Sequence, residues 1–228
     1  MTKEGIGETT EDRFLDGRVM IRQPRLGYRA AMDPVLLAAA APHLKRGHVL
    51  DLGAGVGTAG LCYAWRADNM RVTGLELQPP LAELARQNAQ INGMAARVDC
   101  VTGDLLSPPA EVKAAHIFDM VLTNPPYLRP SQADRSPNAM RDTANVEGDA
   151  DLEKWLHFAL KSLKPKGWLV MIHSADRLDD ILAKLHGRLG EVAVIPLWPQ
   201  IGRDAKRIIL RGRKGVKGPA RMTPGLAL

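Results

Sequence analysis

Short apolar runs alternate along the chain with segments in which apolar residues recur at helical spacing, from about residue 48 almost to the C-terminal end. The run at residues 118–123 is typical of a buried parallel strand. The seven runs that we interpret as strands are residues 48–53, 71–77, 97–102, 118–123, 167–173, 192–197 and 206–211. Because strands that alternate with helices form layered sheets, the pattern predicts an α/β fold with a doubly wound, mostly parallel sheet.

Four segments between these runs have the pattern of helices. They are residues 59–67, the segment in which Leu81, Leu84, Ala85 and Asn88 share one face, residues 152–163 and residues 175–189. The last two strands are joined by residues 198–205 without a helix, so we expect them to pair as an antiparallel edge hairpin. One more helix is expected before the sheet, with Asp33 as its N-cap, Pro34 as its first residue and Pro42 at its end.

This arrangement predicts one main domain with short appendages. The domain covers residues 46–212, after an N-terminal segment, residues 1–45, that contains one short helix. Residues 213–228 form a basic tail whose order the sequence leaves open. Residues 128–148 form a polar loop of about twenty residues, which is longer than compact folds usually allow unless the loop is a lid or a binding loop.

The composition is that of a globular protein with one well-buried core, because 45% of the 228 residues are hydrophobic and 25% are charged. The longest apolar run, residues 34–42, is half as long as a membrane span, and the polar N-terminus lacks the apolar region of a signal peptide. We therefore expect a cytoplasmic protein and no membrane partner. Cys62 and Cys100 have neither C-x-x-C spacing nor a nearby histidine pair, which favours a reducing compartment and no metal site.

The net charge of +6 is concentrated near the two ends of the chain. Near the N-terminus five arginines face one acid, Asp16, and they are Arg13, Arg18, Arg22, Arg25 and Arg29. Residues 203–221 hold eight basic residues against Asp204. If the fold brings both segments together, they make a patch for phosphates, the usual signature of a nucleic-acid partner. The charge alone fits a solvated surface and a disordered tail equally well.

The tetrapeptide Asn124-Pro125-Pro126-Tyr127 closes the apolar run 118–123. Two successive prolines cannot donate to a sheet ladder, so the strand stops there, and they hold the Asn124 amide and the Pro125 carbonyl in a rigid turn. Such a turn presents hydrogen-bond acceptors without a nucleophile. Acceptors on both N–H bonds help a planar amine to pyramidalise as it attacks an electrophile, and Tyr127 would stack on the planar group. Alone, the tetrapeptide also fits a strand that ends at proline beside a packed tyrosine.

A glycine-rich turn directly follows the first predicted strand and contains Asp51, Gly53, Ala54, Gly55 and Gly57. Glycines there let the backbone approach a ligand and turn sharply into the next helix. Residues 55–60 also match G-x-G-x-x-G, so a dinucleotide site competes with one for S-adenosyl-L-methionine. The carboxylate of Asp51 suits the ammonium of S-adenosyl-L-methionine, or a water network around its methionine part, but would repel a pyrophosphate.

Two further acids lie at the ends of predicted strands. Glu76, followed by Leu77, is placed to accept from ribose hydroxyls in either kind of site, whereas Asp104 could accept from an adenine amine while Leu105 packs on the base. A lone aspartate at the position of Asp104 is more often a turn cap. Together with Asp51 and Asn124, these acids fall at the carboxyl ends of strands, the edge at which open α/β sheets bind ligands.

With these residues, the chain resembles the Rossmann-like, class I S-adenosyl-L-methionine-dependent methyltransferases that carry an Asn/Asp-Pro-Pro-Tyr motif, over about residues 20–212. The segment 23–29 (QPRLGYR), which leads to residues 33–38 (DPVLLA), looks like the N-terminal signature of the bacterial valine-tRNA adenine N6-methyltransferase family. The resemblance implies methylation of the exocyclic amine of an adenine in RNA, most naturally tRNA. The residues from 129 to 135 and the tail after Arg213 match no known motif.

The resemblance also implies roles for the residues of the site. The glycine-rich turn would hold the methionine and ribose part of S-adenosyl-L-methionine, Glu76 the ribose, and Asp104 with Leu105 the adenine. Asn124 and the Pro125 carbonyl would hold the target amine while Tyr127 stacks on the base. Arg29 and Asp33 would close the site over the cofactor.

The same motif leaves other functions open. Protein glutamine methyltransferases use it on a side-chain amide, although they usually carry a larger helical N-terminal domain than the roughly 45 residues that precede the first strand here. Other enzymes with this chemistry methylate a guanine amine in ribosomal RNA. A dinucleotide-dependent oxidoreductase and a non-catalytic RNA-binding module are the alternatives from other classes.

Overall fold

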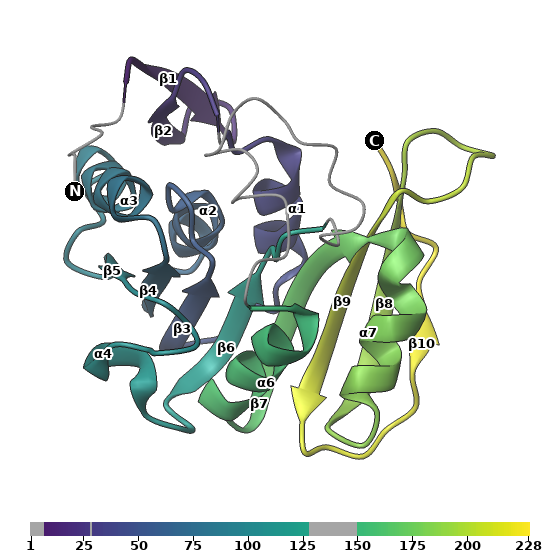
Figure 1. Ribbon diagram of the computed structural model, residues 1–228. Helices are drawn as coiled ribbons and strands as arrows, with labels where there is room; N and C mark the ends of the chain where they lie inside the picture. Colours follow the sequence, from purple (N-terminus) through teal and green to yellow (C-terminus); the bar gives the residue numbers. More distant parts are fainter. Residues whose placement is uncertain (1–6, 28, 128–149) are drawn as a thin grey trace.

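The computed structural model describes residues 7–27, 29–127 and 150–228 (Figure 1). Within these residues the main sheet has the strand order β10-β8-β9-β7-β6-β3-β4-β5, and β11 also pairs with β8. The seven strands that match the predicted runs are β3 (Gly47–Leu52), β4 (Met70–Glu76), β5 (Val98–Thr102), β6 (Phe118–Thr123), β7 (Leu163–Ser174), β8 (Leu189–Trp198) and β9 (Arg207–Lys214). The predicted doubly wound, mostly parallel sheet is therefore confirmed.

The strand order creates a crevice in the middle of the sheet. β3 pairs in parallel with β4 on one side and with β6 on the other. The strands that follow β3 are therefore added first on its β4 side and later on its β6 side. Ligands of open α/β sheets bind at such a switch point, outside the carboxyl ends of the strands. β9 is antiparallel to both β7 and β8 and lies between them, which confirms the predicted hairpin.

Helices cover both faces of the sheet (Figure 1). α1 (Met32–Ala40), α2 (Thr58–Arg66) and α3 (Pro79–Ile91) bury one apolar cluster with Val49 of β3, whereas α6 (Leu152–Ser162) and α7 (Leu178–Leu185) bury a second cluster with Leu50. Successive side chains of a strand point to opposite faces, so apolar residues are needed at every position of the central strands. A short helix, α4 (Ala110–Lys113), and a 3-10 turn, Ala175–Arg177, complete the helical elements that the structure describes.

The start of α1 differs from the prediction. Ala31 is the N-cap residue, no side chain caps the helix, and Asp33 lies inside the first turn. The prediction of Asp33 as the N-cap is therefore wrong. Pro34 is still compatible with the first turn, where a missing N–H costs nothing. The carboxylate of Asp33 is consequently free to bind elsewhere.

The N-terminal segment contains a β-hairpin as well as α1, so the expectation of a helix alone was incomplete. β1 (Thr9–Phe14) and β2 (Val19–Pro24) pair antiparallel. Only β2 buries a face, through Val19 and Ile21, whereas β1 alternates between exposed and half-buried residues. A strand with so little apolar surface has no clear hydrophobic pattern in the sequence.

Asn88 in α3 and Asn92, the C-cap residue of this helix, hold the hairpin against the main domain. The side-chain amide of Asn88 accepts from the Arg22 N–H at 2.8 Å and donates to the Arg22 carbonyl at 2.9 Å. Asn92 makes the same pair of bonds with Met20, at 2.8 and 2.6 Å. Each amide thus bonds both the backbone N–H and the carbonyl of one residue of β2, as a neighbouring strand would. Asn88 also donates to the Val56 carbonyl at 2.9 Å, so it joins the hairpin to the glycine-rich turn.

The basic tail is part of the sheet. β9 continues to Lys214, beyond the predicted domain end at residue 212, and β10 (Arg221–Met222) and β11 (Leu226–Ala227) pair in parallel with β8. Gly190 permits this packing, because a Cβ atom there would lie 1.9 Å from the Val216 carbonyl oxygen. The tail therefore covers what would otherwise be an open strand edge.

Parts of two predictions lie outside the described residues. They are the polar loop 128–148 and Tyr28 in the segment that resembles a family signature. Among the helices that the structure describes, none combines the length and the apolar character needed to cross a bilayer.

Candidate active site

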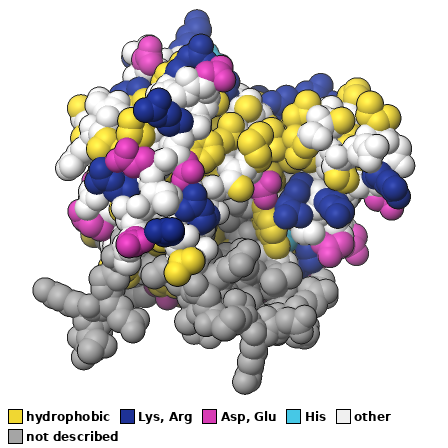
Figure 2. Space-filling view, turned by 90° about the horizontal axis from the view of Figure 1, so that it is seen from above, with side chains coloured by type: hydrophobic (Ala, Val, Ile, Leu, Met, Phe, Trp, Pro, Cys, Tyr) yellow, Lys and Arg dark blue, Asp and Glu magenta, His cyan; other side chains and the backbone are white. Residues whose placement is uncertain are grey.

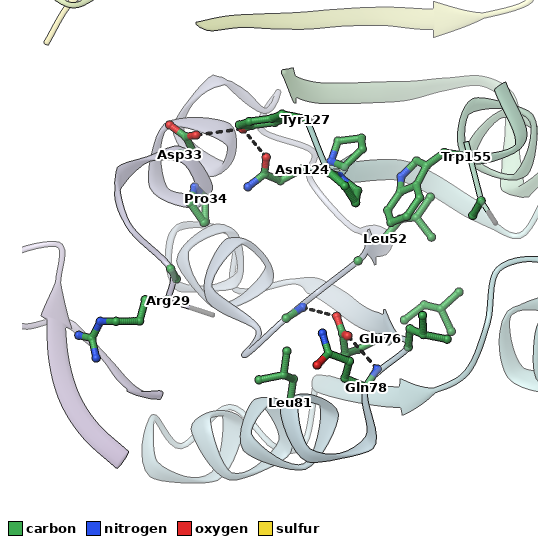
Figure 3. A pocket seen from close by; sticks show the side chains of 18 of the residues that line it. Arg29, Asp33, Pro34, Leu52, Glu76, Gln78, Leu81, Asn124, Tyr127 and Trp155 are labelled. Carbon is green, nitrogen blue, oxygen red and sulfur yellow. Dashed lines mark hydrogen bonds between the residues drawn. The ribbon is translucent and has the colours of Figure 1, made fainter. Parts of the chain in front are cut away.

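A cavity of about 640 Å³ opens at the carboxyl ends of β3, β4, β5 and β6 (Figure 3). The predicted site residues that line it are Gly53, Gly55, Glu76, Leu77, Asp104, Leu105, Asn124, Pro125, Pro126, Tyr127 and Asp33. Three predicted site residues, Asp51, Ala54 and Gly57, do not line it. The fold thus gathers most of the predicted residues into one space at the switch point of the sheet.

Glu76 organises the wall of the cavity at the tip of β4. One carboxylate oxygen accepts from the Gly55 N–H at 2.8 Å and the other from the Gln78 N–H at 2.9 Å (Figure 3). Each oxygen keeps a lone pair, so the group can still accept two hydroxyl hydrogens. Burial raises the pKa of Glu76, and the backbone N–H donors oppose this shift only in part.

Asp51 lies beneath the glycine-rich turn. It is 3% exposed and accepts from the Gly60 N–H at 2.8 Å. Burial, and then the charge of nearby Glu76, raise the pKa of Asp51 to about 7. Its visible function is to hold the start of α2 against β3. A direct contact between Asp51 and a cofactor stays a prediction.

Gly53 and Trp155 form a tight contact that shapes the floor of the cavity. Gly53 has φ +75°, and a Cβ atom there would lie 2.8 Å from Cζ2 of Trp155. The Trp155 indole N–H donates to the Thr123 hydroxyl at 2.7 Å, and that hydroxyl donates to the Leu52 carbonyl at 2.9 Å. Sequence reasoning missed Trp155 as a site residue, because its spacing is that of the buried face of α6.

Asp104 lies in the turn after β5. One of its oxygens accepts from the Leu106 N–H at 2.9 Å, which is the turn-cap function that a lone aspartate would have. Asp104 and Leu105 also line the cavity. A cap bond uses one oxygen only, so the predicted contact with an adenine amine is sterically open and stays a prediction.

The tetrapeptide after β6 forms the opposite end of the cavity. The Tyr127 hydroxyl lies 2.5 Å from Oδ1 of Asn124 and 2.9 Å from Oδ2 of Asp33 (Figure 3). The same Asp33 oxygen accepts from Nε of Arg207 at 3.2 Å. Asp33 was predicted on the cofactor side, but both of its partners belong to the tetrapeptide side of the cavity. Arg207 had been grouped only with the basic C-terminal segment.

The ring of Tyr127 already has neighbours. The guanidinium carbon of Arg207 lies over it, 4.8 Å from the ring centroid, and the His173 ring is 5.0 Å away at a tilt of 53°. A base that stacked on the face under Arg207 would have to displace the guanidinium. Stacking of Tyr127 on a target base therefore stays a prediction.

Four of the five N-terminal arginines form ion pairs within the described residues, with acids in the hairpin or next to it. From the sequence, Asp16 alone had been counted against these arginines. Antiparallel pairing places Glu11 beside Arg22 at 2.9 Å and Glu8 beside Arg25 at 2.7 Å. Arg29 pairs with Asp12 at 2.7 Å. Arg29 does line the cavity, as Arg25 does, but its bonds hold it to the hairpin. These arginines therefore contribute little net positive charge.

The C-terminal basic segment also fails to form one patch. It includes the strand β9, so Arg207 lies at the cavity while Lys214, at the other end of the strand, donates to the Leu163 carbonyl at 2.8 Å. Figure 2 shows basic side chains interspersed with acidic ones on the face seen from above. Within the described residues, the N-terminal segment and the C-terminal basic strand are joined by the Arg207–Asp33 pair and by a hydrogen bond from Arg211 to the Ala40 carbonyl at 2.8 Å.

The groups around the cavity fit S-adenosyl-L-methionine better than a dinucleotide. Glu76 offers acceptors for ribose hydroxyls, and the leucines that line the cavity, among them Leu77 and Leu105, offer apolar surface to a base. Glu76 would serve either kind of ligand, so the preference rests on Asp51 behind the glycine-rich turn, whose carboxylate opposes a pyrophosphate when it is ionised. In the described residues no three His, Cys, Asp or Glu side chains gather as a metal-binding group.

Comparisons with known proteins agree with this geometry. Residues 32–195 match the family model described as methyltransferase small domain. A Porphyromonas gingivalis protein named tRNA1(Val) (adenine(37)-N6)-methyltransferase is 33% identical over 89% of this chain and 81% of its own length. A protein of the same name from Actinobacillus pleuropneumoniae is 31% identical over 89% and 84%.

Solved structures show the same fold. A predicted O-methyltransferase from Agrobacterium tumefaciens superposes with a TM-score of 0.69 at 26% identity, over 86% of this chain and 87% of that one. M. jannaschii TYW2, solved in complex with AdoMet, superposes with a TM-score of 0.60 at 13% identity, over 93% and 88%.

Proposed function

The chain belongs to the methyltransferase small domain family and, within it, to the tRNA1(Val) (adenine(37)-N6)-methyltransferases, and from this premise we propose that it methylates N6 of an adenine in tRNA. One observation carries the proposal: Asn124 and Pro125 end a strand inside the same cavity that Glu76 and the glycine-rich turn line. Methyl donor and planar amine can therefore meet in one space. Because the chain belongs to a methyltransferase family, we discard the alternative of a dinucleotide-dependent oxidoreductase.

S-adenosyl-L-methionine is the methyl donor, and when bound it supplies an electrophilic methyl group on a positively charged sulfur. Glu76 would hold the ribose hydroxyls through its two remaining lone pairs. Gly53 and Gly55 would let the backbone approach the ligand, and Asp104 with Leu105 would hold the adenine. These contacts orient the donor and require no covalent bond to the protein.

Asn124 and the Pro125 carbonyl act on the target amine. Each accepts one N–H bond, which localises the nitrogen lone pair for attack and stabilises the positive charge that develops. Neither group has to give or take a proton before the new bond forms. Holding both reactants in line supplies much of the remaining rate enhancement.

The partner is tRNA, and a groove beside the cavity supports this assignment. The groove, of about 340 Å³, shares Leu105 with the cavity. Its basic lining residues are Lys154, His157, Lys161 and Arg188. The side chains of Lys161 and Arg188 make no hydrogen bond or ion pair within the described residues. Unlike the hairpin arginines, they keep their charge for the phosphates of an RNA strand that leads to the site.

The test is methylation of tRNA by the purified protein. Valine tRNA transcripts, incubated with the enzyme and S-adenosyl-L-methionine and digested to nucleosides, should yield N6-methyladenosine by mass spectrometry. A transcript with guanine in place of the adenine next to the anticodon on its 3′ side is the control and should stay unmodified. Methylated guanine, or methylation of protein glutamine alone, would refute the proposal.

Asn124→Ala supplies the matched catalytic control. Loss of one acceptor that acts in the transition state should lower kcat by about 10²–10³-fold. The affinity for S-adenosylhomocysteine, measured by calorimetry, should stay within about twofold because Glu76 and the glycine-rich turn are untouched. Wild-type turnover in this variant would remove Asn124 from the mechanism.

A further inference from the structure

The hydroxyl of Tyr127 faces two acceptors but has a single hydrogen. Its oxygen is 2.9 Å from Oδ2 of Asp33 and 2.5 Å from Oδ1 of Asn124, both within hydrogen-bond distance (Figure 3). A phenol can donate to one partner only, and its oxygen can at the same time accept from another. One of the two contacts must therefore be a bond that Tyr127 accepts.

Asp33 is the stronger competitor for this hydrogen. It is ion-paired with Arg207 at 3.2 Å, and a charged acceptor takes a hydrogen bond in preference to a neutral amide. Burial first, and then the charge of Asp33, raise the pKa of Tyr127, so the phenol keeps its proton. If that proton pointed at Asn124 instead, the phenol oxygen would face a carboxylate oxygen at 2.9 Å with no hydrogen between them.

When Tyr127 donates its hydrogen to Asp33, the side-chain amide of Asn124 has to turn its amino group toward the phenol oxygen. Half a turn about its last side-chain bond exchanges the carbonyl oxygen and the amino group without moving the backbone. The amino group then donates to Tyr127, and the carbonyl oxygen points into the cavity. In the opposite orientation the amino group would face the cavity, where it would meet the N–H bonds of the target amine as a second donor.

We propose that Asp33 is a positioning residue: by taking the hydrogen of Tyr127 it orients Asn124 with its carbonyl oxygen toward the target amine. This inference rests on the proposed function. Asp33 comes from the first turn of α1, 94 residues before Tyr127, and has no capping duty there. Tyr127 transmits the orientation through its oxygen rather than through its ring.

Four variants test the hydrogen-bond chain on tRNA with the full-length enzyme. Asp33→Ala and Tyr127→Phe should each lower kcat by about 10–100-fold, while the affinity for S-adenosylhomocysteine and KM for tRNA stay within about twofold. The double variant should be no slower than the slower single variant, because both changes break one chain. Asp33→Asn replaces the charged acceptor by a neutral amide that is no stronger than Asn124, so it should recover at most part of the rate. Multiplied losses in the double variant would overturn the proposal.

A second set of variants uses a side chain at position 124 that needs no particular orientation. Asn124→Asp places an oxygen at both ends of the side chain, so either rotamer offers an acceptor to the amine. In this background Asp33→Ala should cost less than about threefold in kcat. An equal loss in both backgrounds would mean that Asp33 merely supports the local structure.

Nuclear magnetic resonance gives a readout that is independent of turnover. In the complex with S-adenosylhomocysteine, the side-chain amide protons of Asn124 should show a contact with the Tyr127 ring protons that is lost in Asp33→Ala. Absence of this contact in the wild-type protein would overturn the positioning role. If the wild-type enzyme methylates no tRNA and yet shows the contact, the proposed function fails and the hydrogen-bond chain stands.

Discussion

The two ends of the cavity are built in different ways. At the end around Glu76, the partners are close in sequence: Glu76 binds Gly55, 21 residues away, and Gln78, two residues away. At the end around Asn124, Tyr127 binds Asp33, 94 residues away, and Asp33 binds Arg207, 174 residues away. The first end follows from adjacent strand tips, whereas the second exists only when both ends of the chain have folded onto the sheet.

This difference predicts separate functional losses. Glu76→Ala removes the acceptor for the ribose and leaves the Gly55 and Gln78 N–H groups without a partner. We expect the affinity for S-adenosylhomocysteine to fall by about 100-fold, which is about 2.7 kcal/mol and within the range of a hydrogen-bonded charged group. Calorimetry measures this directly. Glu83→Ala, which removes an exposed acid of α3 paired with Arg86, is the control and should bind normally.

The two ends of the cavity would not have separate functions if Glu76→Ala bound S-adenosylhomocysteine normally but had a lower kcat, which is the result expected for Asn124→Ala. The two ends would then share one function, and the cofactor would have to lie elsewhere in the cavity.

Gly53→Ala probes the backbone of the end around Glu76. The new Cβ would lie 2.8 Å from Trp155 at a residue with φ +75°. We expect a loss of about 2–3 kcal/mol in the free energy of unfolding and a weaker cofactor site. Gly93→Ala is the matched control, because Gly93 has φ +66° and no atom within 4 Å of the added Cβ. The difference between the variants in urea unfolding isolates the contact with Trp155. Equal losses would mean that backbone strain alone matters.

The same contrast explains what the sequence could predict. Glu76, Asn124 and the glycines were predicted because each ends or directly follows an apolar strand, and parallel strands place their carboxyl ends at one edge. The seven strands were predicted for a related reason, since buried strands need apolar residues throughout. Local pattern and strand direction were sufficient for these features.

Features that depend on distant contacts were missed. Nothing in the segment around Asp33 indicates that its carboxylate meets Tyr127, and Asp-Pro at a helix start favoured a capping role instead. Trp155 has the spacing of a core residue and lines the cavity only because Gly53 leaves room for its ring. The hairpin was missed because β1 has no apolar face and because side-chain amides of Asn88 and Asn92 hold β2 in addition to the buried Val19 and Ile21.

Asp51 adds an electrostatic test of the end around Glu76. Its pKa in the folded protein is raised from the ordinary 3.8 to about 7. Between these values the folded state binds a proton that the unfolded chain releases, so its stability falls as pH rises from about 4 to 7 and the penalty is constant above. Asp51→Asn has no such proton.

Relative to Asp51→Asn, the wild-type protein should therefore lose about 2–3 kcal/mol of unfolding free energy between pH 5 and pH 8. Urea unfolding of both proteins without ligand at the two pH values measures the change. A difference that does not vary with pH would show that Asp51 is ionised in the fold and that burial does not dominate its environment.

The smallest expected effect concerns the approach of RNA, where the contrast lies between paired and unpaired basic residues. Lys161→Glu with Arg188→Glu reverses charge in the groove beside Leu105, and KM for tRNA should rise by about 5–10-fold with a weaker dependence on salt. Arg18→Glu with Arg22→Glu changes the charge equally in the hairpin, where Asp16 and Glu11 already neutralise both arginines. That control should change KM by less than about twofold. If the hairpin variant had the larger effect, RNA would approach over β1 and β2, and the groove would have no part in binding.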